Sequence, residues 1–437
     1  MAVQDLDASL IARLDDGSAN IVVVGQGYVG LPVALRAVEI GWSVVGFDTS
    51  EARINALQAA RSYVEDVSSE QLRAAIESGK YRPSKDPADL AGFDVAVITV
   101  PTPLREGTPD LSYIESAAAS LAAHLKPGAL VVLESTTYPG TTEELLCPIL
   151  EQSGLCVGVD FMVGYSPERI DPGNPKFTFV NTPKVVSGID AASTRAVERF
   201  YGGLVDETVA VGSTGEAELV KLLENTFRHV NIALVNELAM FARDLGVDIW
   251  SAIDATSTKP FGYMRFTPGP GVGGHCLPID PSYLAWRVER RLGQRFRFVE
   301  LANDVNSHMP DYVITRVISL LNGESRAVRG SRILLIGLAY KAGTSDWRES
   351  PSTEIAQQLA GLGADVRIHD RHVPHDDVLP FDALRVECSP DEVEAADLVM
   401  ILVDHPDLPY DMICSHARLI FDTKGCLRGR EFTGEVL

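Results

Sequence analysis

The first 50 residues contain the feature that most restricts how this chain can fold. The apolar run Ile21–Val24 predicts a buried parallel strand, and a helical pattern follows it. The strand and the helix are joined by a GxGxxG sequence, whose three glycines are Gly25, Gly27 and Gly30. A second apolar run, Val44–Phe47, ends in Asp48, eighteen residues after Gly30. This order of strand, glycine turn, helix, strand and acid predicts a βαβ unit of the doubly wound, Rossmann type.

Such a turn is suited to a dinucleotide. Glycines let the backbone approach a pyrophosphate, which the N-terminus of the following helix attracts. We therefore expect the turn, including Tyr28 and Val29, to bind the cofactor, with Asp48 accepting hydrogen bonds from the ribose hydroxyls. Because Asp48 would repel a ribose 2′-phosphate, the sequence favours NAD over NADP. Arg53 could lie over the adenosine end or be a solvated helix residue.

Three later apolar runs end in polar loops, where a doubly wound sheet collects its ligands. The first two loops contain Thr102 and Thr136, which could border the nicotinamide and a sugar or could cap turns. The third contains Glu168 and Arg169. Glu168 could act as a general base, hold a water molecule or pair with Arg169.

A long helical pattern without internal Gly or Pro extends from Gly215 to Leu245. It could bridge two domains or pack against a second subunit. Lys221 and Asn225 lie one turn apart on it, so they share a face. Together they could stabilise an oxyanion, and the alternative is a solvated helix face.

The loop at residues 269–281 is too rich in Gly and Pro to be a helix or a strand. It contains Cys276, preceded by Gly273 and followed four residues later by Asp280. An ionised thiol is a strong nucleophile, so we expect Cys276 to attack a carbon and Asp280 to manage a proton or orient a partner. The alternative is a buried cysteine in a tight loop.

Two further segments contain candidate ligand-binding residues, and the cations of the second suit a phosphorylated ligand. An aromatic segment ahead of the cysteine loop contains Tyr263 and Arg265, and could close over a sugar or a base or cross a subunit boundary. Residues 332–341 repeat the first strand and turn without the GxGxxG, and Lys341 and Arg348 lie in the loop that follows.

These patterns predict an α/β chain of two Rossmann-like doubly wound domains joined by a central long helix. The expected domains are an N-terminal NAD-binding domain at 1–211, a central helical domain with the cysteine loop at 212–310, and a C-terminal Rossmann-like domain at 311–437.

Composition limits the partners of the chain. With 38 Lys and Arg against 60 Asp and Glu, its net charge of −22 should repel nucleic acid and anionic membranes. The first residues lack a signal-peptide layout, and no apolar run is long enough to span a bilayer. The six cysteines form no CxxC pair and no metal-like cluster, so we expect a cytoplasmic protein with reduced thiols and no metal.

The chain resembles the UDP-glucose/GDP-mannose dehydrogenases over nearly its whole length. The motifs that carry this resemblance are Gly25–Pro32, Ser166–Arg169, Lys221–Asn225, Gly273–Asp280, and Lys341 with Asp346, Arg348 and Ser350–Pro351. Enzymes of this family oxidise the 6-hydroxymethyl group of a nucleotide sugar to a carboxylate with NAD. The resemblance implies a nucleotide-sugar substrate, a C-terminal domain that binds its nucleotide, and a homodimer or larger homo-oligomer built through the central helices.

The resemblance also implies how the catalytic residues act. Cys276 would trap the aldehyde as a thiohemiacetal, and loss of a second hydride would give a thioester for hydrolysis. Lys221 and Asn225 would stabilise the oxyanions, while Asp280 would support Lys221 and the catalytic water. Glu168 would assist hydrolysis as a base or as a water holder.

Nine residues would bind the substrate: Glu168, Arg169, Lys221, Asn225, Tyr263, Arg265, Gly273, Lys341 and Arg348. Thr136 would hold a water near the reacting carbon. UDP- or TDP-glucose is the first expectation for the sugar. A UDP-N-acetylhexosamine is the alternative, because Ile279 stands where the glucose-specific branch commonly has Lys, and the segment around the cysteine loop is similar to the UDP-N-acetylglucosamine branch.

Two other classes of protein share parts of this pattern. A hydroxyacid dehydrogenase that transfers a single hydride would need the first domain and a Lys/Asn helix, but no cysteine loop. A non-enzymatic nucleotide sensor would not require Cys276, Lys221, Asn225 and Asp280 to occur together.

Overall fold

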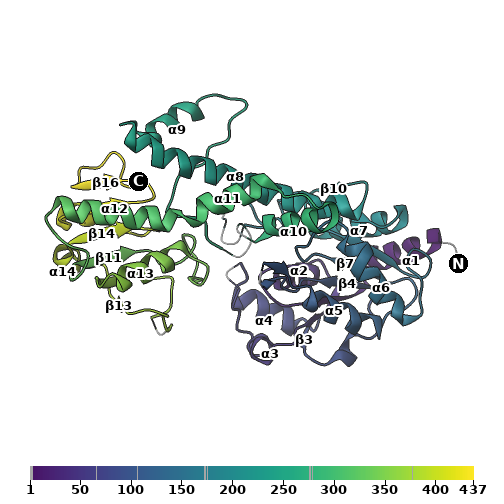
Figure 1. Cartoon of the computed structure of the whole chain (residues 1–437). Helices are drawn as coiled ribbons and strands as arrows, with labels where there is room; N and C mark the ends of the chain where they lie inside the picture. The colour runs from purple at the N-terminus through teal and green to yellow at the C-terminus, as the bar shows by residue number, and fades with distance from the viewer. Residues whose placement is uncertain are drawn as a thin grey trace. The chain divides into compact units, whose positions relative to one another are not determined.

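The computed structural model describes residues 3–64, 66–105, 107–171, 174, 176–274, 277, 279–375 and 377–437, with only the backbone for 3–6. The chain divides into two compact units, each an α/β structure (Figure 1). The first comprises Met1–Glu224 and Ser282–Gly293, and the second Asn225–Pro281 and Gln294–Leu437. Among the helices of the described residues, none has the length and apolar character needed to cross a membrane.

An eight-stranded sheet forms the centre of the first unit, in the order β10-β9-β8-β7-β4-β1-β2-β3. Its strands are β1 Asn20–Val24, β2 Ser43–Phe47, β3 Tyr81–Ser84, β4 Val95–Ile98, β7 Leu130–Leu133, β8 Met162–Tyr165, β9 Lys184–Gly188 and β10 Thr208–Ala210. Six strands, from β3 to β8, run parallel in the order expected of a dinucleotide-binding domain. The direction reverses between β8 and β9.

Helices and short turns connect these strands. They are α1 Val3–Asp15, α2 Gly30–Glu39, α3 Glu51–Gln58, α4 Ser69–Glu77, η1 Pro87–Leu90, α5 Ser112–Ala122, η2 Thr142–Leu146, α6 Cys147–Leu150, η3 Glu151–Ser153 and α7 Ala191–Leu204. A small antiparallel hairpin consists of β5 Leu104–Arg105 and β6 Thr108–Pro109. Two helices belong partly to each unit: α8 Thr214–Asp244 and α10 Asp280–Leu292.

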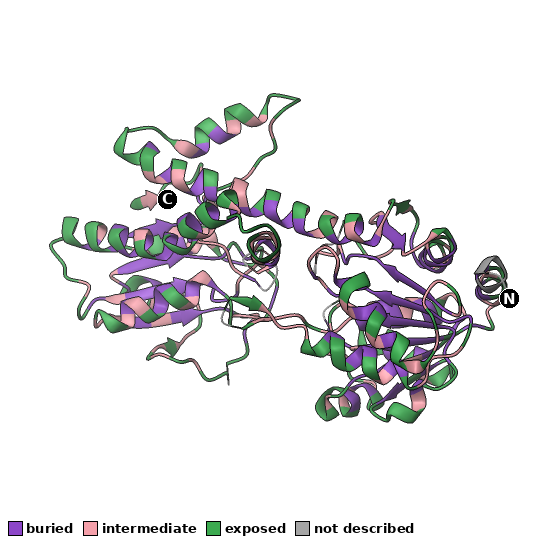
Figure 2. Cartoon of the chain, turned by 45° about the vertical axis from the view of Figure 1, so that its right-hand side comes forward, coloured by how far each residue is buried: buried purple, intermediate pink, exposed green. Residues whose placement is uncertain are grey.

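Strand residues alternate between two apolar cores, one on each face of the sheet. Along β1, Ile21 and Val23 enter the core shared with α1, α2 and α7, whereas Val22 and Val24 enter the core shared with α5 and α6. This alternation follows from the two-residue period of a strand. Because both faces are covered, the central strands have continuous apolar sequences. Figure 2 shows these strands almost wholly buried.

The second unit repeats this architecture in six parallel strands, ordered β13-β12-β11-β14-β15-β16. They are β11 Arg332–Ile336, β12 Asp365–His369, β13 Leu384–Arg385, β14 Leu398–Ile401, β15 Ile420–Asp422 and β16 Gly434–Val436. Helices α12 Met309–Gly323 and α13 Pro351–Gly361 cover one face, and α14 Pro390–Ala395 and α15 Tyr410–His416 cover the other. Two further helices complete the unit: α9 Ile249–Ser257 and α11 Arg297–Ser307.

The predicted fold class is confirmed, with two doubly wound sheets and a 31-residue α8 where the long helix was expected. Five strands of the two large sheets were not predicted, β3, β9, β10, β13 and β16, and neither was the β5–β6 hairpin. Four of these lie toward the sheet ends and are short or polar, as in the Tyr-Arg-Pro-Ser sequence of β3. Such strands lack the apolar run on which the predictions depended.

Candidate functional site

The turn between β1 and α2 has glycine at two positions where a side chain would clash with the backbone. Gly25 has a φ of 95°, and a Cβ there would lie 2.7 Å from the carbonyl oxygen of Thr99. A Cβ on Gly30 would lie 1.8 Å from the Gly25 carbonyl oxygen, so helix and strand could not pack this closely. A Cβ on Gly27 would meet nothing within 4 Å. Gly27 therefore leaves open space over the turn, as the approach of a pyrophosphate requires.

Asp48 ties the end of β2 to this turn. Its carboxylate accepts hydrogen bonds from the backbone N–H groups of Gln26 (2.9 Å) and Ser50 (2.8 Å), and from the Arg53 guanidinium (3.2 Å). The Gln26 side chain is buried beneath the turn and accepts from the Tyr81 hydroxyl at 2.7 Å. Arg53 thus lies beside the predicted ribose acid, while Gln26 is a supporting residue that the sequence interpretation missed.

Thr102 and Thr136 meet beyond the ends of β4 and β7, as strand order predicts. The Thr102 hydroxyl donates to the carbonyl oxygen of Thr136 at 2.9 Å. Farther along the loop that contains Thr136, the backbone N–H groups of Gly140 and Thr142 donate to the carboxylate of Glu218 on α8, at 2.5 and 2.8 Å. Burial raises the pKa of Glu218 to about 7, against the effect of these donors. This fully buried acid fixes the loop to α8 and was not predicted, because nothing local in the sequence distinguishes it.

Glu168 lies in a buried charged cluster just beyond β8. Its Oε1 accepts from the backbone N–H groups of Arg169 (2.6 Å) and Ile170 (2.5 Å), and its Oε2 accepts from the ammonium of Lys184 (3.0 Å). The Arg169 guanidinium instead pairs with Glu224 at 2.6 Å. The alternative in which Glu168 simply pairs with the Arg169 side chain is therefore not what the structure contains.

Asn225 and Asp280 meet within the second unit. The Asn225 amide donates to an Asp280 carboxylate oxygen at 2.6 Å, and both side chains are buried. An amide nitrogen has two N–H donors, and no described residue accepts from the second. Lys221, one turn earlier on α8, is half-buried and has no ion-pair partner within the described ranges. These donors have the chemistry needed to stabilise an oxyanion.

The start of the cysteine loop is packed against the second unit's own sheet domain. The Gly274 N–H donates to the carbonyl oxygen of Glu349 at 2.8 Å, and a Cβ on Gly274 would lie 3.0 Å from the Tyr340 ring. A Cβ on Gly273 would lie 2.7 Å from the same Glu349 oxygen. Both glycines are therefore needed for this close packing. Cys276 itself lies outside the described residues.

The second unit repeats the glycine turn and also the acid that binds its backbone. Gly337 has a φ of 95°, as Gly25 has. The Asp370 carboxylate accepts the backbone N–H groups of Leu338 (2.7 Å) and Ala339 (2.9 Å). The Leu338 contact corresponds to the one between Gln26 and Asp48 in the first unit. The Ala339 contact adds a second backbone donor, at the position that Gly27 occupies in the first turn.

Two predicted substrate cations are held by acids. Arg348 makes a bidentate contact with Asp346 at 2.9 and 2.6 Å, and Arg265 pairs with Asp254 of α9 at 2.5 Å. Both arginines are exposed, so a ligand would have to share or displace these partners. Two other predicted substrate residues of this unit are half-buried: Tyr263 and Lys341.

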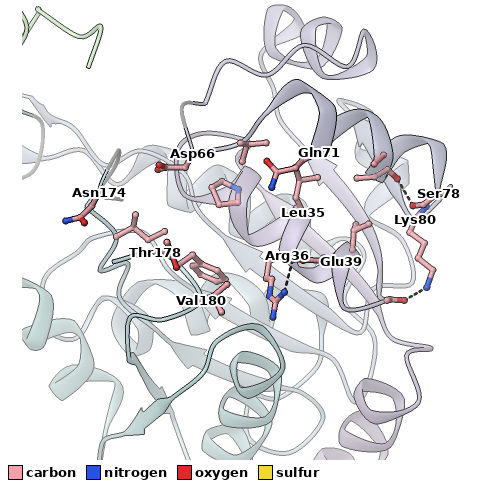
Figure 3. Close-up of a pocket in the computed structure, with 18 of the residues that line it drawn as sticks. Leu35, Arg36, Glu39, Asp66, Gln71, Ser78, Lys80, Asn174, Thr178 and Val180 are labelled. Carbon is pink, nitrogen blue, oxygen red and sulfur yellow. Dashed lines mark hydrogen bonds and ion pairs between the residues drawn. The ribbon is translucent and has the colours of Figure 1, made fainter. Parts of the chain in front are cut away.

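A cavity of about 780 Å³ opens elsewhere, between α2, α4 and the segment after Ile170 (Figure 3). Leu35 and Arg36 of α2 and Gln71 of α4 line it, and Thr178 and Val180 face it from the third side. None of the predicted site residues that the structure describes lines this cavity. Across the described ranges, no group of three His, Cys, Asp or Glu side chains could hold a metal ion.

Models of the UDP-glucose/GDP-mannose dehydrogenase family match three consecutive parts of the chain. They are the NAD binding domain at residues 19–205, the central domain at 215–308 and the UDP binding domain at 334–429. The predictions of NAD as cofactor and of an oxidoreductase acting on a CH–OH group are confirmed.

Known proteins resemble most of the chain. It is 35% identical to UDP-N-acetyl-D-mannosamine dehydrogenase of Pyrococcus horikoshii, over 89% of this chain and 90% of that protein. It is 36% identical to UDP-N-acetyl-D-glucosamine 6-dehydrogenase of Pseudomonas aeruginosa, over 82% and 84%. The solved structure of a UDP-glucose dehydrogenase from Pyrobaculum islandicum superposes with a TM-score of 0.83 at 28% identity, covering 95% and 97%.

Proposed function

The chain belongs to the UDP-glucose/GDP-mannose dehydrogenase family, and from this premise we propose that it oxidises the C6 alcohol of a UDP-N-acetylhexosamine to the uronic acid. The observation that carries the chemistry is the 2.6 Å hydrogen bond between Asn225 and Asp280, which brings an oxyanion donor to the cysteine loop. The names of the two relatives at 35% and 36% identity support the N-acetylated sugar.

The proposed reaction removes two hydrides without releasing the aldehyde. NAD supplies the hydride acceptor for both oxidations. After the first, the Cys276 thiolate adds to the C6 aldehyde, and Lys221 and Asn225 stabilise the resulting alkoxide. Loss of the second hydride gives a thioester. Water attacks its carbonyl, the thiolate leaves, and the product is the carboxylate, with Glu168 accepting the proton of the water and Asp280 orienting Asn225.

Two other site roles are part of the proposal. Thr136 holds a water near the reacting carbon, which its place beyond the end of β7 supports. Lys341 and Arg348 bind the nucleotide phosphates, and Arg348 would exchange its contact with Asp346 for the ligand. UDP-glucose is the second candidate substrate, because a UDP-glucose dehydrogenase shares this fold over 95% of the chain.

We also infer that the protein is a homodimer, or a larger homo-oligomer, formed through α8. Six large apolar side chains are exposed along this helix, and a seventh directly follows its last residue: Leu219, Leu223, Phe227, Leu234, Leu238, Phe241 and then Leu245. Their spacing of three, four or seven residues places them in one stripe. Single apolar residues scattered over a surface are ordinary, but a contiguous exposed stripe of this size is typical of a protein–protein interface. Replacing both Leu238 and Phe241 by Glu should give monomers by light scattering, whereas Val159→Glu, at an exposed site outside α8, should not. Unchanged mass in the double variant would contradict the assignment.

A cytoplasmic location is part of the same proposal. The described cysteines are free thiols, which suits a reducing compartment.

The experiment that tests the reaction counts NADH. UDP-N-acetylglucosamine, UDP-N-acetylmannosamine, UDP-glucose, TDP-glucose and GDP-mannose are each incubated with NAD, and absorbance at 340 nm is compared with sugar consumed. Two NADH per N-acetylated sugar are expected. Two per UDP-glucose would select the second candidate instead. One NADH per sugar would remove the thioester step and favour the single-hydride alternative, and no turnover would favour a nucleotide sensor.

A further inference from the structure

A buried group of three charged side chains lies behind Glu168. Glu134 follows directly after β7, Glu168 lies just past β8, and Lys184 is the first residue of β9. Their exposed fractions are 1%, 8% and 3%. The Lys184 ammonium contacts both carboxylates, at 3.0 Å for Glu168 and more closely for Glu134. The Tyr201 hydroxyl donates to the second Glu134 oxygen at 2.8 Å.

Strand direction explains how a lysine comes to this edge of the sheet. Strands β7 and β8 are parallel, so Glu134 and Glu168 both lie at the carboxyl edge where ligands bind. Strand β9 runs antiparallel to β8. Its first residue, Lys184, therefore lies at that same edge, whereas a parallel β9 would begin at the opposite one. The reversal thus places a buried cation beside Glu168.

All four oxygens of the two acids are engaged by this arrangement. Glu168 uses one oxygen for two backbone N–H groups and the other for Lys184. Glu134 uses one for Lys184 and the other for Tyr201. A buried network in which every member has its partners holds those members in fixed positions. Removing one partner of a buried charge pair is costly, because it leaves an uncompensated charge. The two acids exceed the one cation by one charge.

We propose that Lys184 and Glu134 are positioning residues for Glu168, and that they keep it in place as the carboxylate that assists hydrolysis of the thioester. This inference rests on the proposed function. Lys184 acts on Glu168 directly. Glu134, fixed by Tyr201, holds Lys184 on its other side, so that the ammonium stays buried and charged.

The electrostatics of the cluster agree with these roles. Burial raises the pKa of Glu134 above its usual range, against the pull of Lys184. Burial would also raise the pKa of Glu168, but Lys184 and the hydrogen bonds lower it below its usual range. The neighbouring guanidinium of Arg169 is directed to Glu224, and the Tyr201 hydroxyl is directed to Glu134. Lys184 is therefore the cation on which an ionised Glu168 depends.

The test separates hydrolysis from the oxidations by rapid mixing of enzyme, NAD and the sugar nucleotide that wild type turns over. Lys184→Met should release its first two NADH per active site within about twofold of the wild-type rate. Later turnovers should be slowed about tenfold or more, because a positioned base contributes roughly 10²- to 10⁴-fold. The sugar should accumulate as a thioester on Cys276, detectable by mass spectrometry. The acid limb of the hydrolysis rate should move upward by about one pH unit or more, since loss of a nearby cation disfavours a carboxylate.

Three variants make the result specific. Lys184→Arg, which keeps the charge, should restore the acid limb to near that of wild type. Lys80→Met, at an exposed lysine that donates to the Gly41 carbonyl, should behave as wild type. The double variant Lys184→Met with Glu134→Gln leaves a single buried acid, and should also accumulate thioester.

The outcomes distinguish the inference from its premise. If wild type releases two NADH but Lys184→Met hydrolyses the thioester at the wild-type rate with an unshifted acid limb, the positioning role is wrong. Failure of both the single and the double variant to fold would equally overturn it, because the cluster would then serve stability alone. If wild type itself releases only one NADH, the proposed reaction fails instead.

Discussion

The substitution Gly273→Ala should damage catalysis without weakening NAD binding. An added Cβ would lie 2.7 Å from the carbonyl oxygen of Glu349, 2.8 Å from Cδ of Pro351 and 2.9 Å from Cβ of Tyr340. None of these atoms can rotate away, since each is fixed by the backbone. The loop must therefore move, and the 2.8 Å hydrogen bond from the Gly274 N–H to Glu349 is strained or lost. Overpacking of this kind costs about 1–3 kcal/mol.

Movement of the loop should reach Cys276, three residues farther along the chain. Misplacement of a reacting group by about 1 Å lowers its rate roughly a hundredfold, so we expect kcat to fall by about 10- to 100-fold. The dissociation constant for NAD should stay within about twofold of wild type, because the dinucleotide turn belongs to the other unit.

Steady-state kinetics, NAD titration by fluorescence and urea unfolding test this prediction together. Gly361→Ala is the matched control, because Gly361 lies at the end of α13 in the same unit and a Cβ there meets nothing within 4 Å. It should be neutral or stabilising by up to about 1 kcal/mol. A kcat for Gly273→Ala within about twofold of wild type would refute the reasoning, since the loop would then tolerate the contact.

Three further outcomes are expected. NAD should be preferred over NADP by up to roughly a thousandfold in kcat/KM, because like charges about 4 Å apart near a protein surface repel by about 4 kcal/mol, and Asp48→Asn should remove most of the preference. Asn225→Ala should lower kcat about a hundredfold with KM little changed, as for loss of an oxyanion donor; a change in KM alone would make it a binding residue. The protonated form of Glu218 should stabilise the fold fully below about pH 4.5, and this stability should be lost as pH rises through about 7, because burial raises its pKa from 4.5 to about 7. The difference amounts to about 3 kcal/mol, and urea midpoints between pH 5 and 8 should show a smaller decline in Glu218→Gln.

Much of the fold follows from local patterns in the sequence. Continuous apolar runs such as Ile21–Val24 and Leu398–Val403 identify central parallel strands, because both faces of such strands are covered and every residue is buried. The helix predicted at Gly215–Leu245 is found as α8, since helical periodicity without Gly or Pro is a local property. Short polar strands such as β13, Leu384–Arg385, have no comparable signal.

The candidate site divides in the same way. The glycine turn and Asp48 are readable because their roles depend on neighbours within one βαβ unit. The Asn225–Asp280 contact joins residues 55 positions apart, and the sequence interpretation did not pair Asp280 with Asn225. Arg348 and Arg265 were expected to face a ligand, and the structure adds the acids that hold them.

By itself, the sequence determined two doubly wound units, an NAD turn and a cysteine loop, because each is encoded by residues close together in the chain. Tertiary structure alone decided which acids are buried beside which cation. Lys184 reaches Glu134 and Glu168 only because β9 is reversed against β8. Strand direction and strand order are set by the packing of the whole sheet, so no local spacing of residues specifies these contacts.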